Sequence, residues 1–326
     1  MSSLKESLSS VEALTARIRA VLEKGELTLP KELLLLKRSL TDKLRTFSYW
    51  LVGSIFLAVV AIVDGSIVWL LYLVLGACIL YTLYLGTLLA RFYRDYANQL
   101  NQALMPAVAE ILGQPITYQS KNEHSSETKN NFQLANLVQE PYTNLEFDGR
   151  YQLASPLPLS LSELQVTRVE SQGKHTNVRV IFHGLFVVVH LQKTLDGITY
   201  LSTKSEKGTF THNSFWSKLV GSEIRETNLE WNQFDQDLHV ATSDGTEARY
   251  ILTPDFMLDL HEWWTEHKEN IRLVFKANRL FILLPDRAVH LGYAPLKLSP
   301  EKLQKYLLSI TKPIWRVLTL VEDVKL

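Results

Sequence analysis

The segment from His261 to His267 comes nearest to a metal-binding pattern in this chain. Its two histidines enclose the sequence Glu-Trp-Trp-Thr-Glu. A zinc-peptidase helix needs histidines four residues apart on one face, and position 265 is a threonine. Histidines six residues apart lie on different sides of a helix, so they cannot share one metal ion. We therefore expect no bound metal and no cofactor.

Other patterns for catalysis are weaker still. The sequence has no G-x-S-x-G element, no P-loop and no dinucleotide-binding glycine pattern. Its single cysteine, Cys78, excludes an intrachain disulfide or thiolate metal site. Glu247, Arg249 and His239 are weak candidates for a site assembled from distant residues. For Glu247 and Arg249, two apart on an expected strand, a surface salt bridge is the favoured interpretation and a ligand or partner contact is the alternative.

The charge balance argues against nucleic acid as a partner. The chain of 326 residues has 34 basic and 34 acidic side chains. Such a balance gives no net field that would concentrate a polyanion at the surface.

Residues 47–90 predict a transmembrane helical hairpin, since they contain a single charged side chain, that of Asp64. Residues 47–63 and 67–90 are each near the length that crosses a bilayer. Asp64, followed by Gly65 and Ser66, is expected to form a turn in water. The alternative for Asp64 is an ionisable group on an ion or proton pathway.

The predicted location is a bacterial inner membrane, with two spans and both termini cytoplasmic. Basic residues flank the two spans, and the turn between them has none. Small residues on the first span, Ser54, Ala58 and Ala61, would let helices approach closely. They are explained by packing within the hairpin or by a homo-oligomer through it.

The remaining chain divides by its pattern into four parts. Residues 1–46 predict amphipathic helices, and residues 91–116 a juxtamembrane helical stalk. Residues 117–133 are polar and predict a linker. Residues 134–326 predict a cytoplasmic domain.

That domain is predicted to be α+β, with a mainly antiparallel sheet and packed helices. Alternating apolar segments give strands at 178–191 and 247–252. Thr253 followed by Pro254 predicts the start of a helix. Residues 271–275 and 279–284 read as a final hairpin.

Two motifs in this domain resemble the bacterial domain-of-unknown-function family numbered 3137. They are Phe182-His183-Gly184-Leu185-Phe186 and the longer block from Glu247 to Met257, which begins E-A-R-Y. The resemblance covers roughly residues 90 to 285 and implies a membrane-bound bacterial protein. It brings no catalytic residues with it.

These observations favour an interaction or regulatory module that is tethered to the membrane and binds a protein partner or lipid headgroups. An enzyme is the less favoured interpretation. Its form would be a membrane-bound hydrolase whose site contains Glu247, Arg249 and His239.

Overall fold

The computed structural model describes residues 10–323 except 25–29, 64–67, 139, 155–156, 173–174, 207–223, 230, 287–290 and 292–293. The chain divides into two compact units. The hairpin unit contains residues 24–104 and 293–303. The sheet unit contains residues 1–23, 105–292 and 304–326.

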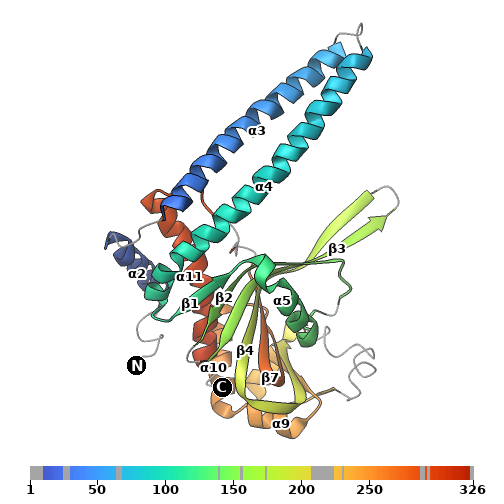
Figure 1. Cartoon of the computed structure of the whole chain (residues 1–326). Coiled ribbons are helices and arrows are strands. Elements are labelled where there is room, and N and C mark those ends of the chain that lie inside the picture. Colours follow the sequence, from blue (N-terminus) through green and yellow to red (C-terminus); the bar gives the residue numbers. More distant parts are fainter. Residues whose placement is uncertain are drawn as a thin grey trace. The chain divides into compact units, whose positions relative to one another are not determined.

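The hairpin unit is built on two long helices, α3 (Lys31–Val63) and α4 (Val68–Leu112), which lie side by side (Figure 1). Ser54 Oγ lies 3.2 Å from Thr82 Oγ1 across the pair. Each hydroxyl also donates to a carbonyl of its own helix, 2.8 Å for Ser54 and 2.7 Å for Thr82. The rings of Trp50 and Tyr81 meet edge to face at 4.9 Å. Ser54 therefore takes part in packing within this hairpin.

Both helices are long and apolar enough to cross a membrane, as predicted. Their most apolar 18-residue windows are almost wholly exposed, with 6% and 0% of the residues buried. The predicted turn at Asp64 lies outside the described residues. Helix α4 runs on to Leu112, after which Gly113 takes a φ of 70°.

The sheet unit contains an antiparallel sheet in the order β1-β2-β3-β4-β6-β5, with β7 also paired to β4. The strands are β1 (Ile116–Gln119), β2 (Asn144–Leu153), β3 (Leu159–Gln172), β4 (His175–Thr203), β5 (Arg225–Glu226), β6 (Leu238–Thr242) and β7 (Arg272–Pro285). The helices are α2 (Val11–Glu23), α5 (Lys121–Ala135), α8 (Asn232–Asp237), α9 (Gly245–Ile251), α10 (Pro254–His267) and α11 (Pro300–Asp323), with a 3-10 turn η1 at Lys204–Glu206. The predicted α+β class is confirmed.

Helices cover both faces of this sheet. On one face, Phe132 of α5 contacts Phe147 and Phe186 of the sheet, at ring separations of 6.1 and 5.6 Å. Val274 of β7 belongs to the same buried cluster. Its neighbour Phe275 points to the opposite face, because side chains alternate along a strand. There it meets Phe256 of α10 at 5.9 Å, so α10 covers the second face.

The predicted polar linker at residues 117–133 is wrong. These residues belong to β1 and α5. The carboxylate of Glu123 accepts the backbone N–H of Ser120 at 2.8 Å, which satisfies a donor at the start of the helix. Only one side of α5 is buried, with Phe132 at 2% exposure. A helix with one narrow buried face can be polar overall and still be anchored by packing.

The predicted final hairpin is also wrong, because residues 272–285 form one bent strand, β7. Ala277 lies at the bend with a φ of 53°. Strand β4 bends beside it: its register with β7 shifts between His190 and Leu195, and again before Ile198. Both central strands therefore bend at the same place, β4 at residues 191–197 and β7 at residues 276–278.

Gly184 explains the shorter of the two motifs. A Cβ atom at this position would lie 2.1 Å from the carbonyl oxygen of Leu284. The close approach of β7 to β4 therefore requires glycine. The flanking Phe182 and Phe186 belong to the buried cluster that α5 covers.

Candidate binding site at the bend of the sheet

The E-A-R-Y block is a helix, not the strand that its alternation predicted. Residues Gly245–Ile251 form α9, and Asp244 caps it by accepting the N–H groups of Thr246 at 2.8 Å and Glu247 at 3.1 Å. Ala248 is fully buried, whereas Tyr250 is 64% exposed. Six residues are too few for alternation to distinguish a strand from two turns of helix.

Glu247 fastens α9 to the bend of β4. Its two carboxylate oxygens accept the backbone N–H groups of Asp196 at 2.9 Å and Gly197 at 2.7 Å. The expected salt bridge with Arg249 is therefore wrong. Because α9 is helical, Arg249 follows two positions later on a different side and is exposed.

A pocket of about 610 Å³ opens between this bend and the corner where α9 passes into α10. Its lining combines residues of β4 (Leu191, Gln192, Lys193, Leu195), the E-A-R-Y block (Arg249, Tyr250, Ile251, Thr253, Pro254, Phe256) and β7 (Phe275). We call it the corner pocket. It exists because β4 departs from regular pairing with β7 at these residues.

Two cations lie at the corner pocket. The ammonium of Lys193 is 3.7 Å from the centre of the Tyr250 ring, within the range of a cation–π interaction. Arg249, on α9, lines the same pocket. Within the part of the chain that the structure describes, neither Lys193 nor Arg249 forms an ion pair with a carboxylate. The corner pocket thus joins an apolar interior to uncompensated positive charge.

Of the three candidate site residues, Glu247 and Arg249 lie at this corner and His239 does not. His239 is buried on β6, opposite Ser202 of β4, and its Nδ1 atom is 3.3 Å from a carboxylate oxygen of Glu226. Glu247 lies past the other end of β6 and is engaged with β4 backbone. The fold therefore does not assemble these residues into a catalytic group.

Sequence reasoning missed Lys193 and the exposed Tyr250 as parts of a site. Lys193 follows the apolar run of β4, and its polar character coincides with the point where the strand leaves its regular register. An interruption of that kind, just before the Asp196-Gly197 turn signal, was the available clue.

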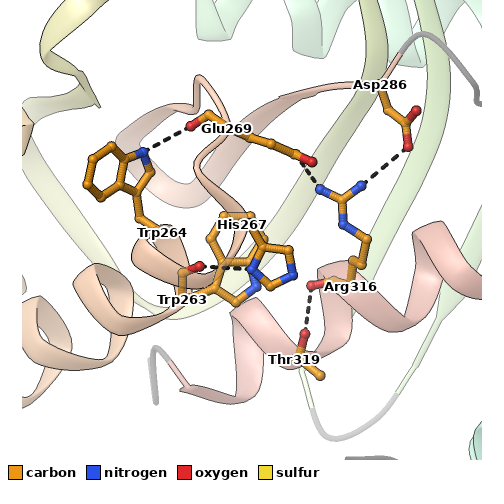
Figure 2. Close-up of polar contacts among 7 residues, drawn as sticks. All are labelled: Trp263, Trp264, His267, Glu269, Asp286, Arg316 and Thr319. Atoms are coloured by element: carbon orange, nitrogen blue, oxygen red, sulfur yellow. Dashed lines mark hydrogen bonds and ion pairs between the residues drawn. The ribbon is translucent and has the colours of Figure 1, made fainter. Parts of the chain in front are cut away.

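The two histidines of the metal-like segment have separate partners. His261 Nε2 lies 2.9 Å from a carboxylate oxygen of Asp237, and His267 Nδ1 lies 2.8 Å from the carbonyl oxygen of Trp263 (Figure 2 shows the second contact). Among the described residues no group of three potential metal ligands is found. These contacts give both imidazoles a structural role at α10.

An arginine that sequence reasoning did not single out ties three elements together nearby. Arg316 of α11 is 8% exposed, and its guanidinium contacts Asp286 at 3.3 Å and also Glu269 (Figure 2). The two carboxylates follow the ends of β7 and α10. Because both sides of the guanidinium are engaged, the arrangement joins α11 to the sheet and leaves little for a ligand to bind.

A second pocket, of about 540 Å³, contains His183 and Arg272. His183 Nε2 is 3.0 Å from Glu163, whose other oxygen accepts the backbone N–H of Leu291 at 2.6 Å. A histidine–carboxylate pair can support a nucleophile, but no serine, threonine or cysteine is among the described residues that line this pocket. His183 is therefore structural here.

His190 lies on β4, near the face of the sheet that α5 covers. Burial and the neighbouring Arg279 lower the pKa of its imidazole. Nearby, Arg150 binds Glu127 of α5 through two hydrogen bonds, at 2.5 and 3.0 Å, and this contact lowers the pKa of the Glu127 carboxyl. These contacts hold α5 against β2 and involve no cavity that the structure describes.

Comparison with known proteins gives a match to one family model. No curated protein matches the chain. The crystal structure of the mycobacterial trehalose monomycolate transport factor A is similar over 53% of this chain and 75% of that chain, with 9% identity and a TM-score of 0.25. A TM-score this low does not indicate a shared fold or a shared function.

The family match begins later in the chain than the resemblance suggested and extends to its end. It covers residues 180–326 and includes both motifs. The matching family model is described as protein of unknown function (DUF3137).

Proposed function

We propose that this protein is a membrane-tethered interaction or regulatory module whose sheet unit binds a ligand or partner at the corner pocket. The observation that carries the proposal is the pairing of an apolar cavity with two cations that have no carboxylate partner among the described residues. Exposed polar, charged and aromatic side chains around a concave apolar site are the usual features of a binding surface. In this chain they come from the bend of β4 and from the E-A-R-Y block.

Membrane anchoring is supported by the exposure of the apolar windows in α3 and α4. A core helix of a soluble protein buries such a window, but here 6% and 0% of these windows are buried. Leaving large side chains such as Ile55, Phe56 and Leu80 in water would be unfavourable. The proposed location is a bacterial inner membrane, with both termini cytoplasmic because basic residues flank the two helices.

A reporter that is active only outside the cytoplasm tests this orientation. Fused after Leu326 it should be silent, and inserted near Gly65 it should be active. The reverse pattern would contradict the proposed topology.

The hydrolase alternative has less support. It needs an acid–base pair or an activated nucleophile within hydrogen-bond reach of a common space. The carboxylate of Glu247 instead holds two backbone N–H groups, and His239 pairs with Glu226. Binding without chemistry is the function that this geometry supports best.

Site-specific photo-crosslinking in intact membranes tests the binding function. A photoreactive residue at Gln192, which is exposed and lines the corner pocket, should form a discrete adduct on irradiation. The matched control is Glu262, exposed on α10 and outside the pocket lining. Equal and unspecific labelling at both positions would refute the proposed site.

A further inference from the structure

We infer that the corner pocket binds a single-chain anionic lipid, with its acyl chain against the apolar lining and its acidic headgroup between Lys193 and Arg249. This inference rests on the proposed function, because it names the ligand of the same pocket. It follows from the size of the pocket, the character of its interior, the charge at its edge and its few hydrogen-bonding groups.

The size and lining indicate a small apolar group. The volume of about 610 Å³ falls within the range of roughly 300–1,000 Å³ that is typical of small-molecule sites. The deepest lining residues are apolar: Leu195, Phe256 and Phe275 are 6%, 3% and 0% exposed. Leu191 and Ile251 are half-buried and extend this surface outward. An acyl chain would replace water mainly on the half-buried Leu191 and Ile251.

The charge at the edge selects an anion. The nearest acidic side chains in the sequence are Asp196, which follows Lys193 on the bend of β4, and Glu247, which precedes Arg249 on α9. Glu247 is occupied by the N–H groups of β4, and Asp196 does not line the pocket. A phosphate or carboxylate would therefore meet Lys193 and Arg249 without a competing carboxylate from the lining, and charge-assisted hydrogen bonds to such groups are the strong ones.

The two segments that carry the cations are fastened to each other before a ligand arrives. Lys193 belongs to the bend of β4 and Arg249 to α9, and Glu247 fastens these two segments to each other. The Tyr250 ring also orients the Lys193 ammonium. A site whose charged groups are already positioned loses less conformational entropy on binding.

The scarcity of hydrogen-bonding groups favours a lipid over an acidic peptide. An extended peptide needs partners for its backbone N–H and C=O groups. The uncharged polar side chains of the lining are Gln192, Thr253 and the phenol of Tyr250. The Thr253 hydroxyl already accepts the N–H of Phe256. A lipid tail makes no such demand, and an anchored protein would meet lipids constantly.

The test uses the full-length protein in phosphatidylcholine nanodiscs, with the photoreactive residue at Gln192 and dodecyl phosphate as the probe. We expect a saturable adduct with the mass of the probe. Dodecyl maltoside has the same chain and a neutral headgroup, and it should need at least about tenfold higher concentration for half-saturation. Equal half-saturation by the two compounds would overturn the inference, and this comparison requires no substitution.

A charge variant tests the same point from the protein side. Lys193→Gln combined with Arg249→Gln should raise the half-saturating concentration of dodecyl phosphate at least about tenfold. The matched control combines Lys129→Gln with Lys312→Gln, which removes two exposed cations elsewhere in the sheet unit and should change nothing. Identical behaviour of the two variants would also overturn the inference.

The identity of the adduct in intact membranes separates the two proposals. A lipid mass on Gln192 supports both of them. A protein or peptide adduct would overturn the lipid inference and leave the binding function intact. Labelling no greater than at Glu262 would overturn the binding function itself.

Discussion

Removal of the Glu247 carboxylate should loosen the bend of β4. The Glu247→Ala substitution deletes the acceptor for the N–H groups of Asp196 and Gly197, at 2.9 and 2.7 Å. It keeps a good helix former within α9. Its effect on stability therefore reports mainly the two contacts between α9 and β4.

The size of the effect follows from the exposure of each contact. A hydrogen bond to a charged group contributes about 1.5–3 kcal/mol when it is shielded from water. The contact with Asp196 is exposed and that with Gly197 is partly buried. Counting the first at about 0.5 and the second at about 1.5 kcal/mol gives a loss of about 2 kcal/mol. In a domain of 150–250 residues this corresponds to a fall in Tm of roughly 4–8 °C.

A double-mutant cycle with Gly197→Ala makes the test sharp. A Cβ atom at Gly197 would lie 2.7 Å from a carboxylate oxygen of Glu247, so this substitution should displace the same carboxylate. The two changes should therefore be strongly non-additive, with a coupling above about 1 kcal/mol. The assay is thermal unfolding of the full-length protein, followed by tryptophan fluorescence, with Glu262→Ala as the control. Additive costs, or a Glu247→Ala loss no larger than the control, would refute this reasoning.

Three further predictions concern charge, pH and the helical hairpin. Arg316→Leu should lower the free energy of unfolding by about 3 kcal/mol, because it leaves two partly buried carboxylates without their cation. Lys312→Leu on the same helix should lower it by under about 0.5 kcal/mol. Denaturant unfolding of the two variants measures the difference. Burial lowers the pKa of His124 from 6.5 to about 4, so the unfolded chain binds the proton first and stability should fall as pH drops from 6.5 towards 4. His124→Gln should flatten that part of the pH profile, and an unchanged profile would contradict the assignment. Ser54→Ala and Thr82→Ala should couple by about 0.6 kcal/mol in a double-mutant cycle measured in nanodiscs, and zero coupling would mean that their contact adds nothing.

Long apolar segments and strong caps were readable from the sequence. The apolar stretch of residues 47–90, with Asp64 as its single charge, predicted two long helices, which α3 and α4 are. Thr253 with Pro254 predicted the start of α10, and the Thr253 hydroxyl does accept the N–H of Phe256. In these cases one local signal decides the outcome, because burial or backbone geometry leaves no competing structure.

Short elements were misread where two patterns compete. Asp244 and Glu247 are spaced as the N-cap and the third residue of a helix, yet the alternation from Glu247 to Leu252 suggested a strand. Ser120 and Glu123 have the same spacing at the start of α5, within a polar segment that predicted a linker. In both cases the capping pair was the better guide than average polarity or alternation.

The site itself depended on contacts that sequence cannot supply. The corner pocket arises from paired bends in β4 and β7, which are 80 or so residues apart along the chain. Nothing local indicates that Lys193 lies against the ring of Tyr250. The tertiary structure alone reveals that Glu247 has a structural role and that the neighbouring cation is exposed.

The bend in the sheet also separates residues whose register is fixed by strand pairing from residues that can change without affecting that register. Between its paired ends, β4 uses nineteen residues (184–202) where β7 uses fourteen (272–285). The register on each side is fixed by its own ladder, so residues within the bulge can be exchanged, added or removed without turning a distant side chain to the wrong face. Four residues that line the corner pocket, Leu191, Gln192, Lys193 and Leu195, come from this bulge. Changes in the bulge can therefore alter the lining of the pocket while the sheet that holds it stays the same.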